Sequence, residues 1–203
     1  MRQIIFATGN QGKMREIRKI LENLIIDGEE TVISSMKEAG IDVQIEENGT
    51  TFTENAIIKA KAVAEQAKGA IVLADDSGLE IDYLNGEPGI YSARYMGEDT
   101  PYHIKNTNLI ERLHGVEEEK RTARFVCAIA AVLPDGKVLT KTGTIEGRIG
   151  HEERGTNGFG YDPIFYVPAY EKSTAELSEE EKNEISHRGK ALRAIRKCLE
   201  ENL

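Results

Sequence analysis

The sequence predicts an α/β protein with a mixed β-sheet and flanking helices. Two observations lead to this fold class. Apolar strand-like runs alternate with helix-like patterns in the first half of the chain, which favours parallel strand pairing. A long hairpin pattern then follows in the middle, and it adds antiparallel strands. The 203 residues are enough for one domain, or for two small lobes that share a core.

Elements of the first half follow from hydrophobic periodicity and turn residues. Residues 3–7 (QIIFA) predict a short buried strand, and the apolar spacing from Met14 to Leu24 predicts an amphipathic helix. A second helix is expected to be capped by Thr53, with Gly69 just past its end. Further strands are expected at 31–34, 41–45 and 70–74, and a half-exposed one at 79–84 (LEIDYL).

Elements of the second half are a helix, a hairpin and a helical tail. Thr100-Pro101 predicts the start of a helix that runs to about His114. The runs RTARFVCAIAAVL and KVLTKTGTI flank the turn PDG, a pattern typical of an antiparallel hairpin. After a glycine-dense loop and the short run IFYV, Ser178 and Glu181 fit a capping box at the start of the tail.

Composition indicates a globular protein and excludes several classes of function. The net charge is 26 − 35 = −9, which argues against a broad surface for DNA or RNA. No apolar stretch approaches the roughly 18 residues of a membrane span, and the N-terminus lacks the pattern of a signal peptide. Cys127 and Cys198 are expected to be reduced, and the protein is expected to be cytoplasmic.

The stretch IVLADDSGLE places two adjacent carboxylates, Asp75 and Asp76, directly after an apolar run. The pair is either a strand terminus with turn residues or a metal or general-base site. Mg²⁺ is typically held by one or two carboxylates together with water and phosphate oxygens. Because adjacent residues of an extended chain point to opposite faces, the two acids need not bind the same ion.

Cations and glycines elsewhere could form a nucleotide site. TGNQGK, residues 8–13, lies between a strand and a helix, where N–H groups and Lys13 would form an anion pocket, although an ordinary turn fits as well. Glu46, Glu47 and Lys59 look like a solvated turn and a surface lysine unless the fold brings them to the acid pair. In GTNGFGYDP, the glycines would let the backbone approach a flat ligand, with Phe159 and Tyr161 as stacking surfaces. The last cluster is Lys182, Ser186, His187 and Arg188, which breaks the helical tail.

Six motifs in this order, TGNQGK, FTENAIIKA, ADDSGLEI, PGIYSARY, GFGYDPIF and KNEISHR, resemble the inosine triphosphate pyrophosphatase family, also called XTP/dITP diphosphatases. The resemblance runs from Thr8 to Arg188. It implies Mg²⁺-dependent hydrolysis of ITP, dITP and XTP to the monophosphate and pyrophosphate. It also implies an elongated fold with the active site in a cleft between two lobes, and a homodimer.

By motif position, the resemblance assigns Asp76 as proton acceptor and metal ligand, with a further metal contact from Glu46 or Glu47. Asp75 is expected to make a separate, supporting contact. The triphosphate would be held by Thr8, Gly9, Asn10, Gln11, Gly12, Lys13, Lys59 and Ser77, with Lys182 beside them. The base would be held by Phe159, Gly160, Tyr161, Asp162, His187 and Arg188. Asn157 stands where many members carry Gly.

These residues suggest a mechanism in which Asp76 activates a water for in-line attack on the α-phosphorus. Two other functions fit the same sequence. One is a related pyrophosphatase that prefers pyrimidine or modified nucleotides, and the other is a nucleotide-binding module that does not hydrolyse its ligand.

Overall fold

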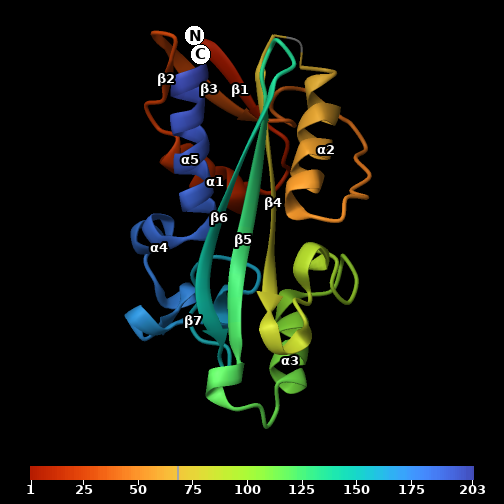
Figure 1. Cartoon of the computed structure of the whole chain (residues 1–203), viewed down its shortest axis with the longest axis vertical. Helices are drawn as coiled ribbons and strands as arrows, with labels where there is room; N and C mark the ends of the chain where they lie inside the picture. Colours follow the sequence, from red (N-terminus) through yellow and green to blue (C-terminus); the bar gives the residue numbers. More distant parts are fainter. Residues whose placement is uncertain (68) are drawn as a thin grey trace. The chain divides into compact units, whose positions relative to one another are not determined.

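The computed structural model describes residues 1–67 and 69–203, which form an α/β fold with a mixed sheet (Figure 1). The strands are β1 (Arg2–Phe6), β2 (Ile25–Ile26), β3 (Glu29–Ser35), β4 (Ile71–Ile81), β5 (Thr122–Val132), β6 (Val138–Ile149), β7 (Phe165–Val167) and β8 (Lys172–Ser173). The α-helices are α1 (Gln11–Ile20), α2 (Phe52–Ala64), α3 (Tyr102–Arg112), α4 (Glu179–Ile185) and α5 (His187–Asn202). β1 pairs in parallel with β3 and β4, whereas β7 pairs antiparallel with β6 and β8. The predicted fold class is confirmed.

The chain divides into two compact units. The first unit comprises Met1–Asp76, Cys127–Gly143 and Arg188–Leu203. The second comprises Ser77–Val126 and Thr144–His187. Strands β4, β5 and β6 contribute residues to both units, and the boundary in β4 falls between Asp76 and Ser77. The expected cleft between two lobes stays a prediction.

The core of the first unit lies between its strands and the helices α1 and α5. In Figure 1, α1 and α5 lie on one side of β4 and β5, and α2 lies on the other. Met14 and Ile17 give α1 a buried apolar face, and Leu21 at its C-cap packs into the same cluster, as the spacing predicts. The same cluster includes Ile4, Phe6, Ile71, Leu73, Cys127, Ile129, Leu192, Ile195 and Leu199. Cys127 is buried and Cys198 half-buried, and neither forms a disulfide.

The core of the second unit is built by β4 to β7 and α3. Strands β5 and β6 are neighbours in the sheet and are joined by a turn in which the Leu133 amide donates to the Lys137 carbonyl at 2.9 Å. The predicted hairpin is therefore confirmed. Its buried cluster includes Leu79, Ile81, Leu109, Leu113, Phe125, Ile149, Tyr161, Ile164 and Phe165.

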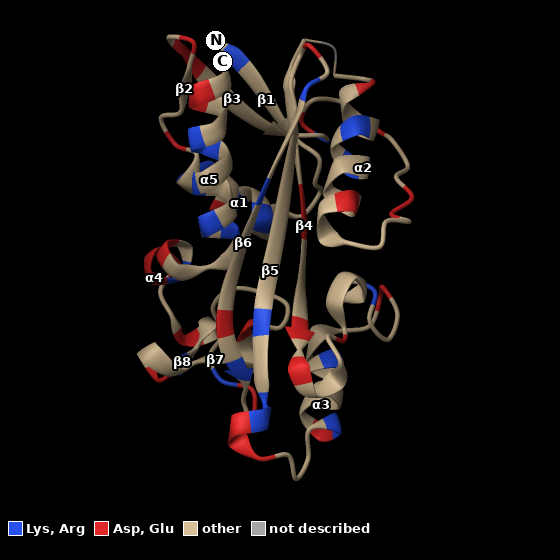
Figure 2. Cartoon of the chain, in the orientation of Figure 1, with Lys and Arg blue, Asp and Glu red and all other residues tan. Residues whose placement is uncertain are grey.

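The acid pair does not end a strand. β4 runs without interruption from Ile71 to Ile81, through ADDSG, so the strands expected at 70–74 and 79–84 are one, and Asp82–Leu84 form a 3₁₀ helix instead of a strand. Asp75 and Asp76 therefore lie near its middle, where Figure 2 shows an acidic segment on β4. Polar and glycine residues are typical of turns, but the buried positions on either side keep this segment extended. The prediction of a strand end here was wrong.

Three smaller predictions were also wrong. Residues 41–45 form no strand. The N-cap of α2 is Thr51, whose hydroxyl accepts from the Glu54 amide at 3.1 Å, so Thr53 lies inside the helix. At α3 the cap position is Pro101, and the Thr100 hydroxyl instead donates to the Met96 carbonyl at 2.7 Å. Local propensity identified each helix but not its first residue, because several neighbouring residues could cap it.

The C-terminal region follows its prediction closely. Ser178 and Glu181 form a capping box at the start of α4. The chain then becomes extended at Ser186 (φ −67°, ψ 155°) before α5 begins, which is the predicted break in the tail. Among the described residues, no helix is both long enough and apolar enough to span a membrane.

Candidate active site

The loop at 8–13 lies beside the acid pair because of the register of β1 and β4. Phe6 pairs with Leu73 in parallel, so the chain leaves β1 just where β4 reaches Asp75. Asn10 caps α1, since its side-chain oxygen accepts from the Lys13 amide at 3.0 Å. The start of α1 therefore presents amide groups and Lys13 next to two buried carboxylates, an arrangement suited to a bound anion.

Asp75 faces two cations and is 1% exposed. Lys13 Nζ lies 3.0 Å from Asp75 Oδ2, and the Nε of Arg188 lies 3.4 Å from the same oxygen. Arg188 also donates to Glu16 Oε2 at 2.6 Å. Burial would raise the pKa of Asp75, but the charges of Lys13, Arg188 and Lys59 outweigh it and hold the pKa well below its usual range.

Asp76 faces a different environment, as the alternation of side chains along a strand requires. Lys59 Nζ lies 3.4 Å from Asp76 Oδ1 and 3.3 Å from Glu47 Oε2. Burial raises the pKa of Asp76, Lys59 lowers it, and the negative charge of Glu47 raises it again, with a net increase. Its other oxygen, Oδ2, is buried and makes no hydrogen bond of full geometry among the described residues. Asp76 is therefore the less stabilised carboxylate of the pair.

Lys59 remains charged in this setting. Burial alone would lower its pKa, but Asp75, Asp76 and Glu47 together raise it. The helix face that carries Lys59 is thus part of the cluster rather than a solvated surface.

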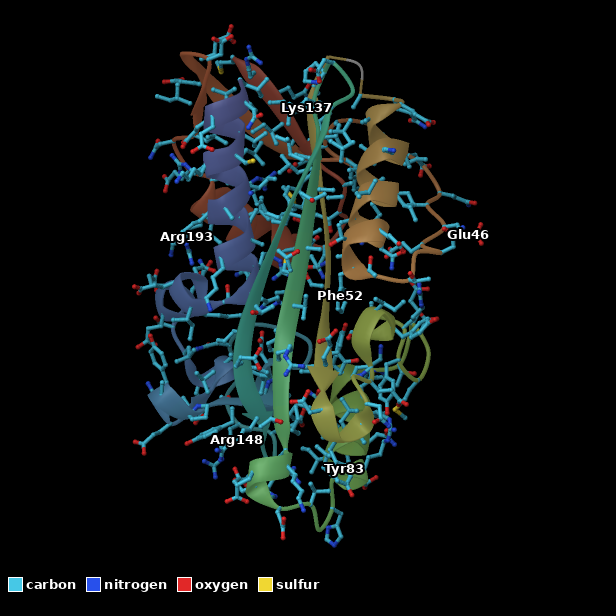
Figure 3. All side chains as sticks on the ribbon, in the orientation of Figure 1. Glu46, Phe52, Tyr83, Lys137, Arg148 and Arg193 are labelled. Atoms are coloured by element: carbon cyan, nitrogen blue, oxygen red, sulfur yellow. The ribbon has the colours of Figure 1, made fainter. Side chains whose placement is uncertain are left out.

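Glu46 and Glu47 differ clearly in their positions. Glu47 is half-buried and forms an ion pair with Lys59. Glu46 is exposed, and Figure 3 shows its side chain pointing outward from the loop before α2. The geometry joins Glu47, and not Glu46, to Asp76.

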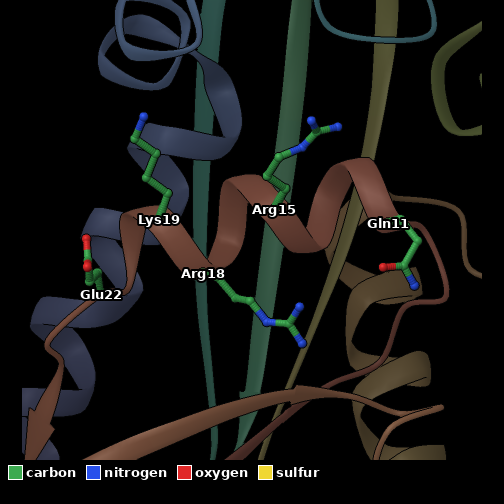
Figure 4. A pocket seen from close by; sticks show the side chains of 5 residues that line it. All are labelled: Gln11, Arg15, Arg18, Lys19 and Glu22. Carbon is green, nitrogen blue, oxygen red and sulfur yellow. The ribbon is translucent and has the colours of Figure 1, made fainter.

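Gln11 is exposed at the start of α1. It lines a shallow pocket of about 640 Å³ together with Arg15, Arg18, Lys19 and Glu22 (Figure 4). All five side chains are exposed. Arg18 also pairs with Glu38. This surface is basic but solvated.

The second unit holds a separate cluster around Asp162, which is 3% exposed. Its Oδ2 accepts from the Phe159 amide and from Lys182 Nζ, both at 2.8 Å. Its Oδ1 accepts from the Thr174 hydroxyl at 2.8 Å. Lys182 Nζ also lies 4.8 Å from the centroid of the Phe159 ring. The structure therefore groups Lys182 with Asp162.

Glycine is required in the loop before Asp162. At Gly158, with φ +73°, a Cβ atom would lie 2.2 Å from Asp162 Oδ2. At Gly155, with φ +83°, it would lie 2.3 Å from the Ala175 carbonyl oxygen. Asn157 does not have a positive φ; its amide group donates to the Leu177 carbonyl at 2.9 Å, so Asn is tolerated there without strain. The loop is closely packed onto its neighbours.

The remaining predicted residues are divided between the units. Tyr161 is a core residue, 5% exposed, whose ring packs edge-to-face on Tyr102, so it offers no open stacking surface. Phe159 is half-buried. His187 stacks on Phe125 in the second unit, with ring centroids 4.9 Å apart. Ser77 is the first residue of that unit, whereas Arg188 belongs to the first.

Two residues of the first cluster were missed by sequence reasoning. Glu16 is 7% exposed and pairs with Arg188, and Asn55 is fully buried near Asp76. A signal existed for both, because each is a polar residue on the inward face of a helix: Glu16 is three residues after Lys13, and Asn55 is four before Lys59.

Known proteins resemble this chain over its full length. It is 47% identical to a dITP/XTP pyrophosphatase of Bacillus licheniformis, covering 99% of this chain and all of that one. It is 48% identical to a dITP/XTP pyrophosphatase of Bacillus subtilis, covering 98% of each chain. Among solved structures, the Staphylococcus aureus Ham1 protein matches with a TM-score of 0.86 at 42% identity, covering both chains completely. A HAM1 protein from Coxiella burnetii matches with a TM-score of 0.87 at 42% identity, covering 99% of this chain and all of that one. Residues 4–198 match the Ham1 family, and the chain therefore belongs to this family.

Proposed function

We propose that this protein hydrolyses noncanonical purine nucleoside triphosphates (ITP, dITP and XTP) to the monophosphate and pyrophosphate, and so cleanses the nucleotide pool. The relatives that bear the name dITP/XTP pyrophosphatase support this activity. The observation that carries it is Asp76, a buried carboxylate beside Lys59 with one oxygen that makes no hydrogen bond of full geometry among the described residues, on the strand next to the Lys13 loop.

The residues around Asp76 fit a magnesium ion. Mg²⁺ needs one or two protein carboxylates and takes its other ligands from water and phosphate. Asp76 and Glu47 provide two carboxylates, and the buried Asp76 Oδ2 makes no hydrogen bond of full geometry among the described residues. The described residues contain no group of three metal-binding side chains, so a site made entirely of protein ligands is not expected. When bound, Mg²⁺ would neutralise charge on the triphosphate.

Asp76 acts as the general base in the proposed reaction. Burial raises the pKa of Asp76, which makes it a better proton acceptor than an ordinary aspartate, and the charge of Lys59 beside it favours the ionised form. It takes a proton from the water that attacks the α-phosphorus, and pyrophosphate leaves. Lys13, Lys59 and the amides at the start of α1 stabilise the negative charge.

Asp75 and Arg188 are proposed to support the phosphate-binding residues through ion pairs, without contacting the substrate themselves. Asp75 holds Lys13, and Arg188 is committed to Asp75 and Glu16. We therefore assign Arg188 to the phosphate cluster rather than to the base.

The cluster around Asp162 receives the base. The half-buried Phe159 ring offers a stacking surface. Hypoxanthine and xanthine carry an acceptor at C6, where adenine carries a donor. Loop amides that donate to this acceptor would be left unpaired by adenine, and such a site discriminates by about 10⁴-fold.

Pyrophosphate release tests the proposal and its alternatives. The enzyme is assayed with ITP, XTP, ATP, GTP and dUTP, each with and without Mg²⁺. Release chiefly from ITP and XTP, and only with Mg²⁺, supports the proposal. Release chiefly from dUTP indicates a pyrimidine-type enzyme, and binding without release indicates a nucleotide-binding module.

We further propose that the enzyme is a cytoplasmic homodimer, because the nucleotide pool is its substrate and the resemblance implies a dimer. Light scattering at micromolar concentration measures the mass directly. A mass of 22.5 kDa, that of one chain, would contradict the dimer.

A further inference from the structure

Asn55 is a buried polar residue of α2 that has no role in the hydrolysis described above. It is 0% exposed and lies in the first turn of α2. It precedes Lys59 by four residues, so both side chains project from the same face of the helix. Since Lys59 reaches Asp76 from this face, Asn55 lies on the side of α2 that carries Lys59 to this carboxylate.

The orientation of the Asn55 amide is fixed by the loop before α2. Its Oδ1 accepts from the Gly49 amide at 2.9 Å. A Cβ atom at Gly49 would lie 2.7 Å from that oxygen, so only glycine allows this close contact. With the carbonyl oxygen held by Gly49, the NH₂ group of Asn55 must face the other way.

One buried donor atom of Asn55 and one buried acceptor atom of Asp76 must then be considered together. Asn55 Nδ2 is a donor and Asp76 Oδ2 is an acceptor; among the described residues neither makes a hydrogen bond of full geometry, and the weaker one from the Asn55 side chain lowers the pKa of Asp76. The Asn55 side chain is close enough to the carboxylate to favour its ionised form. A buried donor and a buried acceptor without hydrogen bonds of full geometry are costly, so their joint retention calls for a function.

We propose that Asn55 is a positioning residue for the hydrolysis proposed above, on which this inference rests. Its NH₂ group orients the Asp76 carboxylate toward the attacking water. Its Oδ1 holds Gly49, two residues after Glu47, and so fixes the loop that brings Glu47 to the same cluster. One side chain thereby aligns two acids that come from separate parts of the chain.

Two substitutions separate these contacts. Asn55→Asp has nearly the same shape and keeps an acceptor for the Gly49 amide, but it has no donor for Asp76. Asn55→Ala removes both. The matched control is Thr51→Ala at the same helix end, which removes the α2 cap and costs about 1 kcal/mol of stability without touching Asp76.

The variants are compared by kcat and KM for ITP with Mg²⁺, by calorimetric binding of ITP without metal, and by thermal unfolding. We expect both Asn55 variants to lose about 100-fold in kcat, because misplacing a catalytic group by a fraction of an ångström has this effect. ITP binding without metal should stay within about threefold of wild type. Thr51→Ala should lower the melting temperature and leave kcat unchanged.

Three outcomes would overturn the inference. Asn55→Asp could keep the wild-type kcat, which would leave only the contact to Gly49. Loss of ITP binding in parallel with kcat would mean that Asn55 acts on the substrate. A fall in kcat in Thr51→Ala equal to that in Asn55→Ala would indicate a purely structural role. Failure of the proposed function is distinct, because wild-type enzyme would then release no pyrophosphate from ITP.

Discussion

Asp76 in the first unit and Asp162 in the second are both buried aspartates beside a lysine, yet their hydrogen-bond partners differ. Asp162 accepts from three donors, the Phe159 amide, Lys182 and Thr174. Asp76 has one long contact to Lys59, a weak one to Asn55 and a negative neighbour in Glu47. The first arrangement stabilises a loop, whereas the second leaves a carboxylate available for a ligand and a proton.

The difference shows why an Asp–Lys pair alone does not identify a catalytic site. What matters is whether the fold satisfies the carboxylate. A carboxylate whose oxygens all accept hydrogen bonds from the protein contributes to stability, and it has few acceptor sites free for a substrate. A carboxylate kept short of partners costs stability and is typical of a functional site.

The largest expected effect comes from Asp76→Asn, which removes the proposed base. We expect kcat for ITP to fall about 10³-fold with little change in nucleotide affinity. Stability should stay level or rise, because burial disfavours the Asp76 carboxylate and Asn carries no charge. Steady-state pyrophosphate release and thermal unfolding measure the two effects. Near-normal turnover would remove Asp76 from its proposed role.

Asp75→Asn should lower the stability of the protein, whereas Asp76→Asn should leave it level or raise it. It leaves Lys13 and Arg188 without their shared partner, at a cost of about 3 kcal/mol. Urea unfolding at neutral pH measures the loss. An unchanged unfolding midpoint would show that the pair contributes nothing.

The decrease in the free energy of unfolding at acid pH gives a second test of the role of Asp75. Its folded-state pKa is lowered, so its contribution is present above its ordinary value of 3.8 and is lost as the pH falls below that value. Wild type should lose this stability in acid, and Asp75→Asn should lack that part of the decline. Urea unfolding midpoints measured between neutral pH and acid compare the two.

Asp162→Asn, in the second unit, tests the difference between Asp76 and Asp162 directly. It leaves the buried Lys182 without its anion and disturbs the donors of the loop, so we expect a loss of about 2 kcal/mol. Unlike Asp76→Asn, it should lower the unfolding midpoint in urea. Equal stability changes in the two variants would end the distinction between a bracing and a reactive aspartate.

The smallest effects separate the two glutamates. Glu47→Gln should raise the Mg²⁺ concentration needed for half-maximal activity about tenfold, because a carboxylate of the cluster loses its charge. Glu46→Gln is the matched control, and its exposed side chain predicts no change. The same shift in both variants would contradict the assignment of Glu47.

The fold class, the hairpin, the α4 capping box and the order of the chemistry-bearing motifs could all be predicted from the sequence. Each rests on residues close together in the chain, where periodicity, turn residues and caps act locally. The capping box of Ser178 and Glu181 is an example, since its two partners are three residues apart. The membership of the family likewise follows from motifs in a fixed order.

Only the tertiary structure decided how those motifs meet. The parallel register of β1 and β4 places Lys13 beside Asp75, and α2 brings Lys59 to Asp76. Sequence alone suggested that the acid pair ends a strand, whereas long-range packing keeps β4 extended through it and turns its two acids to different partners. Burial, charge and hydrogen bonding between distant segments set the environment of each carboxylate. They hold the pKa of Asp75 low beside two cations and raise the pKa of Asp76 by burial.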